Sequence, residues 1–125
     1  MAYTQAKIQI GSLSAASDLS AKQYHFVKLA SETTVDIISA NTDTPIGVLM
    51  NKPAAGEAAE ICVLGIAKVK AHGSVTFGQV LGTTSAGKAE ANPGATQKVM
   101  GQAIQDASAN DVFTIFLNPT NCLNT

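Results

Sequence analysis

Charged residues are scarce in this 125-residue sequence, and their scarcity limits the partners that we expect. Asp, Glu, Lys and Arg make up 14% of the residues, against roughly 25% in an average soluble domain. The eight basic residues are scattered along the chain, and the formal net charge is −1. Because phosphate backbones are bound mainly through clustered basic side chains, we expect no nucleic-acid partner.

Long apolar runs and paired cysteines are also lacking. No stretch approaches the length of a membrane span, and the first residues do not form the basic and apolar segments of a signal peptide, so we expect no membrane partner. The two cysteines lack the spacing of a zinc site or a redox dithiol. Cys62, in an apolar run, is predicted to be a small core residue, and Cys122, in a polar tail, a free thiol. A disulfide between them stays open as the alternative.

A catalytic motif is missing as well. His25 alternates with Tyr24 and Phe26 in a predicted strand, and His72 precedes Gly73 in a predicted turn, so neither is expected to act as a base. No Gly-x-Ser-x-Gly sequence is present to display a nucleophile. The carboxylates that we considered as metal ligands are isolated, without a histidine partner or the dense spacing of a calcium loop. They are Asp36, Asp43, Glu57, Glu60, Asp106 and Asp111.

Lys52 is the residue that we considered as a site for a covalently attached cofactor. Small β-sandwich carrier domains display a modified lysine at a hairpin tip, and Lys52 lies in a predicted turn, directly before Pro53. That proline, and the absence of acidic or methionine flanks on both sides, argue against this role. We therefore predict no catalytic residue, no cofactor-binding residue, no metal ligand and no cofactor, and we expect that the protein is not an enzyme.

The residues that are abundant indicate β structure. Hydrophobic residues make up 46% of the chain and fall in short runs separated by Gly, Pro, Asn, Asp and Ser, which is typical of strands and turns rather than of helices. We predict an all-β fold, a small single-domain β-barrel or sandwich with at most one short helix, for which residues 14–22 are the candidate. The expected strands are 5–10, 24–29, 34–39, 46–50, 60–70 with a break at Gly65 as an option, 74–81, 99–105 and 112–117.

Several of these strands are apolar on both faces. Phe113, Ile115 and Leu117 alternate with Val112 and Phe116 in the last strand, and alternate side chains point to opposite sides of a sheet. The segment 61–70 shows the same pattern: one face carries Ile61, Val63, Ala67 and Val69, and the other begins with Cys62, Leu64 and Ile66. We expect another subunit to cover part of this second face; the alternative is that it is covered within the monomer.

The ends of the chain differ from its middle. Residues 1–20 are predicted to be an N-terminal segment and a candidate assembly arm, 21–118 the β domain, and 119–125 a polar C-terminal tail. Within the first segment, residues 2–17 are the part that we expect to reach a neighbouring protomer or a larger assembly.

From Pro45 onward, roughly two-thirds of the chain resembles the capsid decoration (cement) proteins of tailed bacteriophages, a family of small β domains formerly of unknown function. The order of short motifs carries the resemblance more than any one of them. The motifs are Ile46-Gly47-Val48-Leu49, Ala55-Gly56-Glu57, Val63-Leu64-Gly65-Ile66-Ala67-Lys68-Val69, Phe77-Gly78-Gln79-Val80-Leu81, Ser85-Ala86-Gly87-Lys88, Met100-Gly101-Gln102-Ala103-Ile104-Gln105-Asp106-Ala107 and Val112-Phe113-Thr114-Ile115-Phe116-Leu117.

The resemblance implies a structural virion protein that binds the outer surface of an icosahedral phage capsid and stabilises it. Its partners would be the major capsid protein and itself, as a homotrimer at threefold and quasi-threefold positions. Its location would be the outer capsid surface of the virion, after a period in the host cytoplasm during assembly. The alternative is another non-enzymatic phage assembly module, such as a head fibre base, tail component or adhesin domain; a minimal Ser/His hydrolase is a third class.

Overall fold

The computed structural model of this chain describes residues 7–95 and 97–119, and the side chains from residue 12 onward within those ranges. The described residues form nine strands and no helix, so the predicted all-β class is confirmed. The strands are β1 (Lys7–Ala15), β2 (Phe26–Leu29), β3 (Thr34–Ile37), β4 (Pro45–Leu49), β5 (Ala58–Lys70), β6 (Val80–Thr83), β7 (Ala89–Ala91), β8 (Gly101–Ala103) and β9 (Val112–Leu117).

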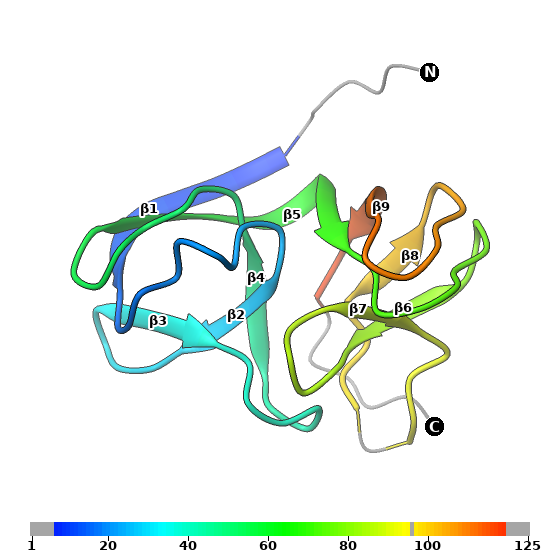
Figure 1. Ribbon diagram of the computed structural model, residues 1–125, viewed down its shortest axis with the longest axis horizontal. Coiled ribbons are helices and arrows are strands. Elements are labelled where there is room, and N and C mark those ends of the chain that lie inside the picture. Colours follow the sequence, from blue (N-terminus) through cyan, green and yellow to red (C-terminus); the bar gives the residue numbers. More distant parts are fainter. Residues whose placement is uncertain (1–6, 96, 120–125) are drawn as a thin grey trace.

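The first five strands close into a barrel, which is the half on the left in Figure 1. Their order is β1-β3-β2-β4-β5, and β5 pairs back with β1 over the antiparallel register from Lys7↔Gly65 to Ser14↔Ala58. Closure gives every strand two neighbours and so leaves no open edge in this half. The barrel is filled by a cluster of buried side chains: Ala15, Leu19, Val27, Val35, Leu49, Ala59 and Ile61.

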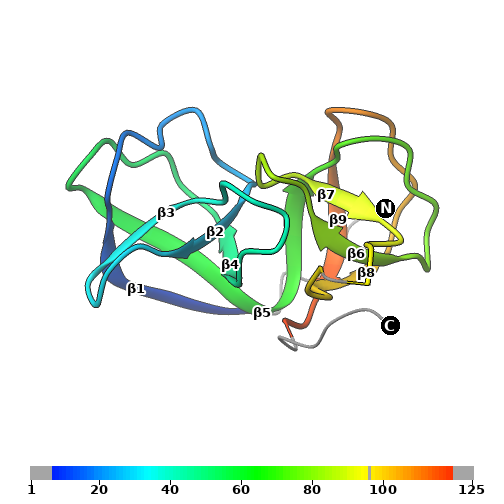
Figure 2. The same ribbon diagram turned by 90° about the horizontal axis from the view of Figure 1, so that it is seen from below.

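Strand β5 joins the barrel to the second half of the molecule. It is 13 residues long and unbroken, and Figure 2 shows it bending as it passes from one half to the other. Gly65 lies where the pairing changes, opposite Lys7 of β1 and Leu117 of β9, and its φ of 109° is a conformation that glycine adopts more readily than other residues. The optional break predicted at Gly65 is therefore a change of partners and not an interruption.

The second half continues the same sheet in the order β5-β9-β8-β6-β7. It curls until Ala89 of β7 forms a bridge with Ala71, directly after β5, where the His72 amide donates to the Ala89 carbonyl at 2.8 Å. Its interior, which reaches into the junction with the barrel, contains Phe26, Ile38, Val48, Cys62, Ala67, Val69, Ala71, Val75, Leu81, Ala89, Met100, Ala103, Phe113, Ile115 and Leu117. Cys62 is a buried core residue, as predicted; Cys122 lies outside the described residues.

The expected and observed elements differ in kind in three places, and several other strands differ only in their bounds. The short helix suggested for residues 14–22 is wrong: Ser14 and Ala15 end β1, and Leu19 anchors the following turns by inserting into the barrel core. The strand expected at 74–81 is mostly a turn, since only Val75 forms a bridge before β6 begins at Val80. Strand β7 was not expected.

Part of the predicted N-terminal segment forms a strand of the barrel. Lys7–Ala15 form β1, while residues 1–6 lie outside the described residues, as do residues 120–125 of the predicted tail. Contacts of either end with another molecule stay a prediction.

Candidate functional site

Exposed aromatic side chains mark one half of the molecule. The chain has only four phenylalanines. Phe26 and Phe113 are buried in the core, whereas Phe77 and Phe116 are 67% and 55% exposed, and both lie in the second half. Because a buried aromatic side chain contributes more apolar area than almost any other residue, leaving two of four in solvent points to a partner surface.

Strand β9 shows how Phe116 comes to face outward. Phe113, Ile115 and Leu117 point into the core and are almost completely buried, while Val112 and Phe116 on the opposite face are exposed. The alternation predicted from the sequence is confirmed. On this second face the monomer covers Thr114, in the middle of the strand, but leaves Val112 and Phe116 uncovered.

In β5 the monomer covers the second face in one part of the strand and leaves it uncovered in another. Ile61 belongs to the barrel core and Cys62 to the second core, so the monomer itself covers both faces at that point. Further along, Leu64 is exposed and Ile66 only half-buried. The uncovered apolar surface therefore begins where β5 leaves the barrel.

A row of paired residues crosses four strands on this side of the sheet. The ladder pairs Ile66 with Phe116, Phe116 with Gln102, and Gln102 with Val80. Residues that are directly opposite on neighbouring strands present their side chains to the same face. We call this row of Ile66, Phe116, Gln102 and Val80 the outer face.

A hollow of about 340 Å³ lies beside the outer face, lined by Val80, Val99, Gly101, Gln102, Phe116 and Asn118. Gly101 shapes it, because a Cβ atom there would collide with the Phe116 carbonyl oxygen. The glycine thus lets β8 and β9 approach closely. Among the described residues that line the hollow, none is charged.

Phe77 lies on a turn that is fixed by hydrogen bonds. The Phe77 amide donates to Asp106 Oδ1 at 2.8 Å, and the Gly78 amide donates to the Ala103 carbonyl at 2.7 Å. Gln102 Nε2 donates to the Gly78 carbonyl at 2.8 Å, so a residue of the outer face also holds the turn. The turn therefore presents an aromatic side chain from a braced backbone.

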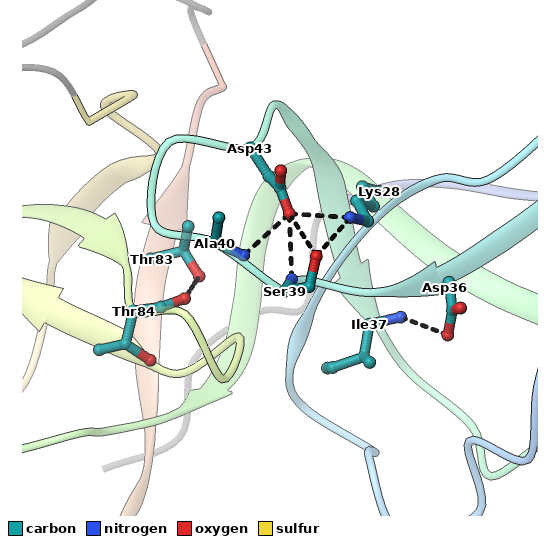
Figure 3. Close-up of polar contacts among 8 residues, drawn as sticks. All are labelled: Lys28, Asp36, Ile37, Ser39, Ala40, Asp43, Thr83 and Thr84. Atoms are coloured by element: carbon teal, nitrogen blue, oxygen red, sulfur yellow. Dashed lines mark hydrogen bonds and ion pairs between the residues drawn. The ribbon is translucent and has the colours of Figure 1, made fainter.

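The densest polar cluster has a structural role. One oxygen of Asp43 accepts hydrogen bonds from Lys28 Nζ at 2.9 Å, from the Ser39 amide and hydroxyl at 3.0 and 3.2 Å, and from the Ala40 amide at 3.0 Å, as Figure 3 shows. The Lys28 ammonium, followed by the Ser39 amide, holds the pKa of Asp43 well below its ordinary value. These contacts fasten the loop between β3 and β4 to β2, and nothing in them resembles a nucleophile and its base.

The two histidines occupy unrelated environments. His25 is buried directly before β2, and its Nδ1 donates to the Gln23 carbonyl at 3.0 Å. Burial lowers the pKa of His25, and the charges of Lys22 and Lys70 act in the same direction. His72 is exposed directly after β5.

The other residues weighed from the sequence make local hydrogen bonds or lie at the surface. Three of the carboxylates accept hydrogen bonds from backbone amides: Asp36 from Ile37, Glu57 from Ala54 and Asp111 from Ser108. Lys52 is exposed. Among residues 7–95 and 97–119, no three His, Cys, Asp or Glu side chains gather as a metal site requires. The same part of the chain has no helix long and apolar enough to cross a membrane.

Two solved structures from phage heads share this fold. Neither a family model nor a curated protein matches the sequence. The base of head fibre gp8.5 of bacteriophage phi29 superimposes with a TM-score of 0.68 at 16% identity, over 96% of this chain and 99% of that one. A chain of the capsid of the Myoviridae phage XM1 superimposes with a TM-score of 0.60 at 20% identity, over 90% and 84%. The likeness establishes a fold that phage head structures contain.

Proposed function

We propose that this chain is a capsid decoration protein, which binds the outer surface of an icosahedral phage capsid as a homotrimer and stabilises the shell. The observation that carries the proposal is the outer face, where Phe116 and Val80 remain exposed on a hydrogen-bonded sheet that continues from the barrel. Such a surface is suited to permanent contact with other subunits. The shared fold with phage head structures supports the same setting.

Decoration requires no chemistry. A shell built from hexamers and pentamers has points where three capsid subunits meet, and a threefold ligand contacts all three in the same way. Linking three weak contacts strengthens attachment by roughly 10²–10⁴. A ligand that binds the intact lattice and not the dissociated subunits stabilises the lattice by mass action.

The experiment is to add the protein to undecorated mature capsids, to count bound copies by cryo-electron microscopy, and to compare the heat resistance of bare and decorated particles. We expect density at threefold and quasi-threefold positions and a higher disruption temperature. Phe116→Ser should lower the occupancy, whereas the matched control Leu29→Ser should not, since Leu29 is 54% exposed but lies on β2 of the barrel. Particles without this density and with unchanged heat resistance would contradict the proposal.

The second candidate is the base of a head fibre, which the match over 99% of the phi29 fibre base favours. The same micrographs separate the two functions. A base would appear at a restricted set of positions and leave the disruption temperature of the shell unchanged, whereas a cement protein would occupy the lattice broadly.

A further inference from the structure

The braced turn at Phe77 presents an exposed aromatic ring, and the outer face of the same chain has an open hollow with an apolar lining beside it. Phe77 is the most exposed of the large hydrophobic side chains described, at 67%, so it does not fill the hollow of its own molecule. Rigid aromatic residues that become buried only on association are the common anchors of protein interfaces. The backbone that carries the ring is already held by Asp106 and Ala103, so only the side chain has to be ordered when the ring is captured.

The hollow has the size and lining to take such a ring. A cavity of about 150 Å³ lined by aliphatic and aromatic side chains binds benzene, and this one measures about 340 Å³ and opens to the surface. Val80, Val99 and Phe116 supply apolar walls, and Gly101 keeps the floor free of a side chain. Gln102, which could otherwise compete as an unpaired polar group, is already bonded to the Gly78 carbonyl.

We propose that the hollow beside the outer face receives Phe77 of a second copy of this chain. Gln102 fixes the anchor and the hollow relative to each other, because its side chain holds the Phe77 turn while its backbone pairs with Val80 and Phe116. An anchor and a receptor at different places on one chain make a head-to-tail contact, which closes into a ring when the rotation allows. With a net charge of −1, copies approach without strong repulsion.

This inference rests on the proposed function, because it assigns the outer face to the contact between protomers of the trimer. The capsid is then bound by other surfaces of the ring. Loss of capsid binding in Phe116→Ser would follow from loss of the trimer and its multiplied contacts.

The test is cysteine cross-linking between two variants, each made in a Cys122→Ser background so that buried Cys62 is the only other thiol. Thr76→Cys, at an exposed position that leaves the neighbouring Phe77 ring in place, and Val99→Cys are mixed under mild oxidation, at concentrations up to millimolar. A disulfide requires Cα atoms about 4.4–6.8 Å apart. We expect a covalent dimer in the mixture and at most traces with either variant alone, and the control mixture of Leu29→Cys with Val99→Cys should give only background.

Sedimentation gives an independent measurement. Phe77→Ala should shift the protein toward the monomer while its unfolding midpoint stays near that of the parent, since the ring contributes little to the core; Leu29→Ala should leave association unchanged. A mixture that cross-links no more than the control would overturn the inference. If wild-type protein still decorates capsids in that case, the proposed function stands; cross-linking without capsid binding would instead sink the proposed function and leave this contact in place.

Discussion

Adjacent residues Ile115 and Phe116 should respond in opposite ways to truncation, because one faces the core and the other faces solvent. Ile115 has no exposed surface and pairs with Ala67 on β5 and with Ala103 on β8. Ile115→Ala removes three carbon atoms, worth about 0.8 kcal/mol each in transfer free energy. Its alanine neighbours are too small to close the gap, so a cavity term of about 24 cal/mol per Å³ adds to this loss. We expect a destabilisation of about 3–4 kcal/mol.

Phe116→Ala is the matched control on the same strand. The side chain is 55% exposed, and burying a whole phenylalanine is worth only about 1.5–3 kcal/mol, so its truncation should cost less than about 1.5 kcal/mol. Urea denaturation with equal m-values measures both free energies of unfolding, and it should be repeated at several protein concentrations because association stabilises the folded state. A cost below about 1 kcal/mol for Ile115→Ala, or equal costs for both, would show that the inside and outside of β9 are wrongly assigned.

Three further predictions concern polar residues. Asp43→Ala should cost about 1 kcal/mol by urea denaturation, since its four donors face a partly exposed oxygen and water replaces part of what is lost; no change would show that the loop holds without it. Burial keeps the pKa of His25 below its ordinary 6.5, so the unfolded chain binds a proton that the folded chain does not; stability should fall as pH drops from about 7 to 5, and less so in His25→Gln. Screening against ester, peptide and glycoside substrates should give background rates only, and turnover that disappears in His72→Ala would contradict a purely structural role.

The local sequence pattern predicts a strand correctly where apolar and other residues alternate and strong turn signals bound the segment. The expected strand 112–117 coincides with β9 because Phe113, Ile115 and Leu117 alternate with other residues directly after the Asn110 turn. It failed for β7, whose Ala89-Glu90-Ala91 sequence has no β-branched or aromatic residue. That strand exists because the Ala71 bridge and β6 hold it on two sides.

The residues around Phe77 show why the candidate surface was only half predictable. The apolar run 74–81 suggests one strand, and in a strand an aromatic residue would be expected to pack against neighbours. The Gln79 side chain instead caps the Thr76 amide at 2.7 Å, and Asp106, distant in sequence, holds the Phe77 amide. No pattern within the run reveals a bond from a residue 29 positions away. The exposed Phe77 is therefore a result of tertiary structure.

Phe116 was placed on an outward face by alternation alone, but its exposure depends on which segments cross that face. The neighbouring strand β5 shows this dependence. Both of its faces are buried at Ile61 and Cys62, because the barrel core lies on one side and the second core on the other. Beyond Gly65 the barrel no longer covers it, and the outer face begins. The bend that connects the two halves thus also creates the uncovered surface. The proposed bracing of a shell requires a protein that is stiffer than the contacts it makes, and the proposed assembly surface lies on a sheet whose ladder continues unbroken through β5 into a closed barrel.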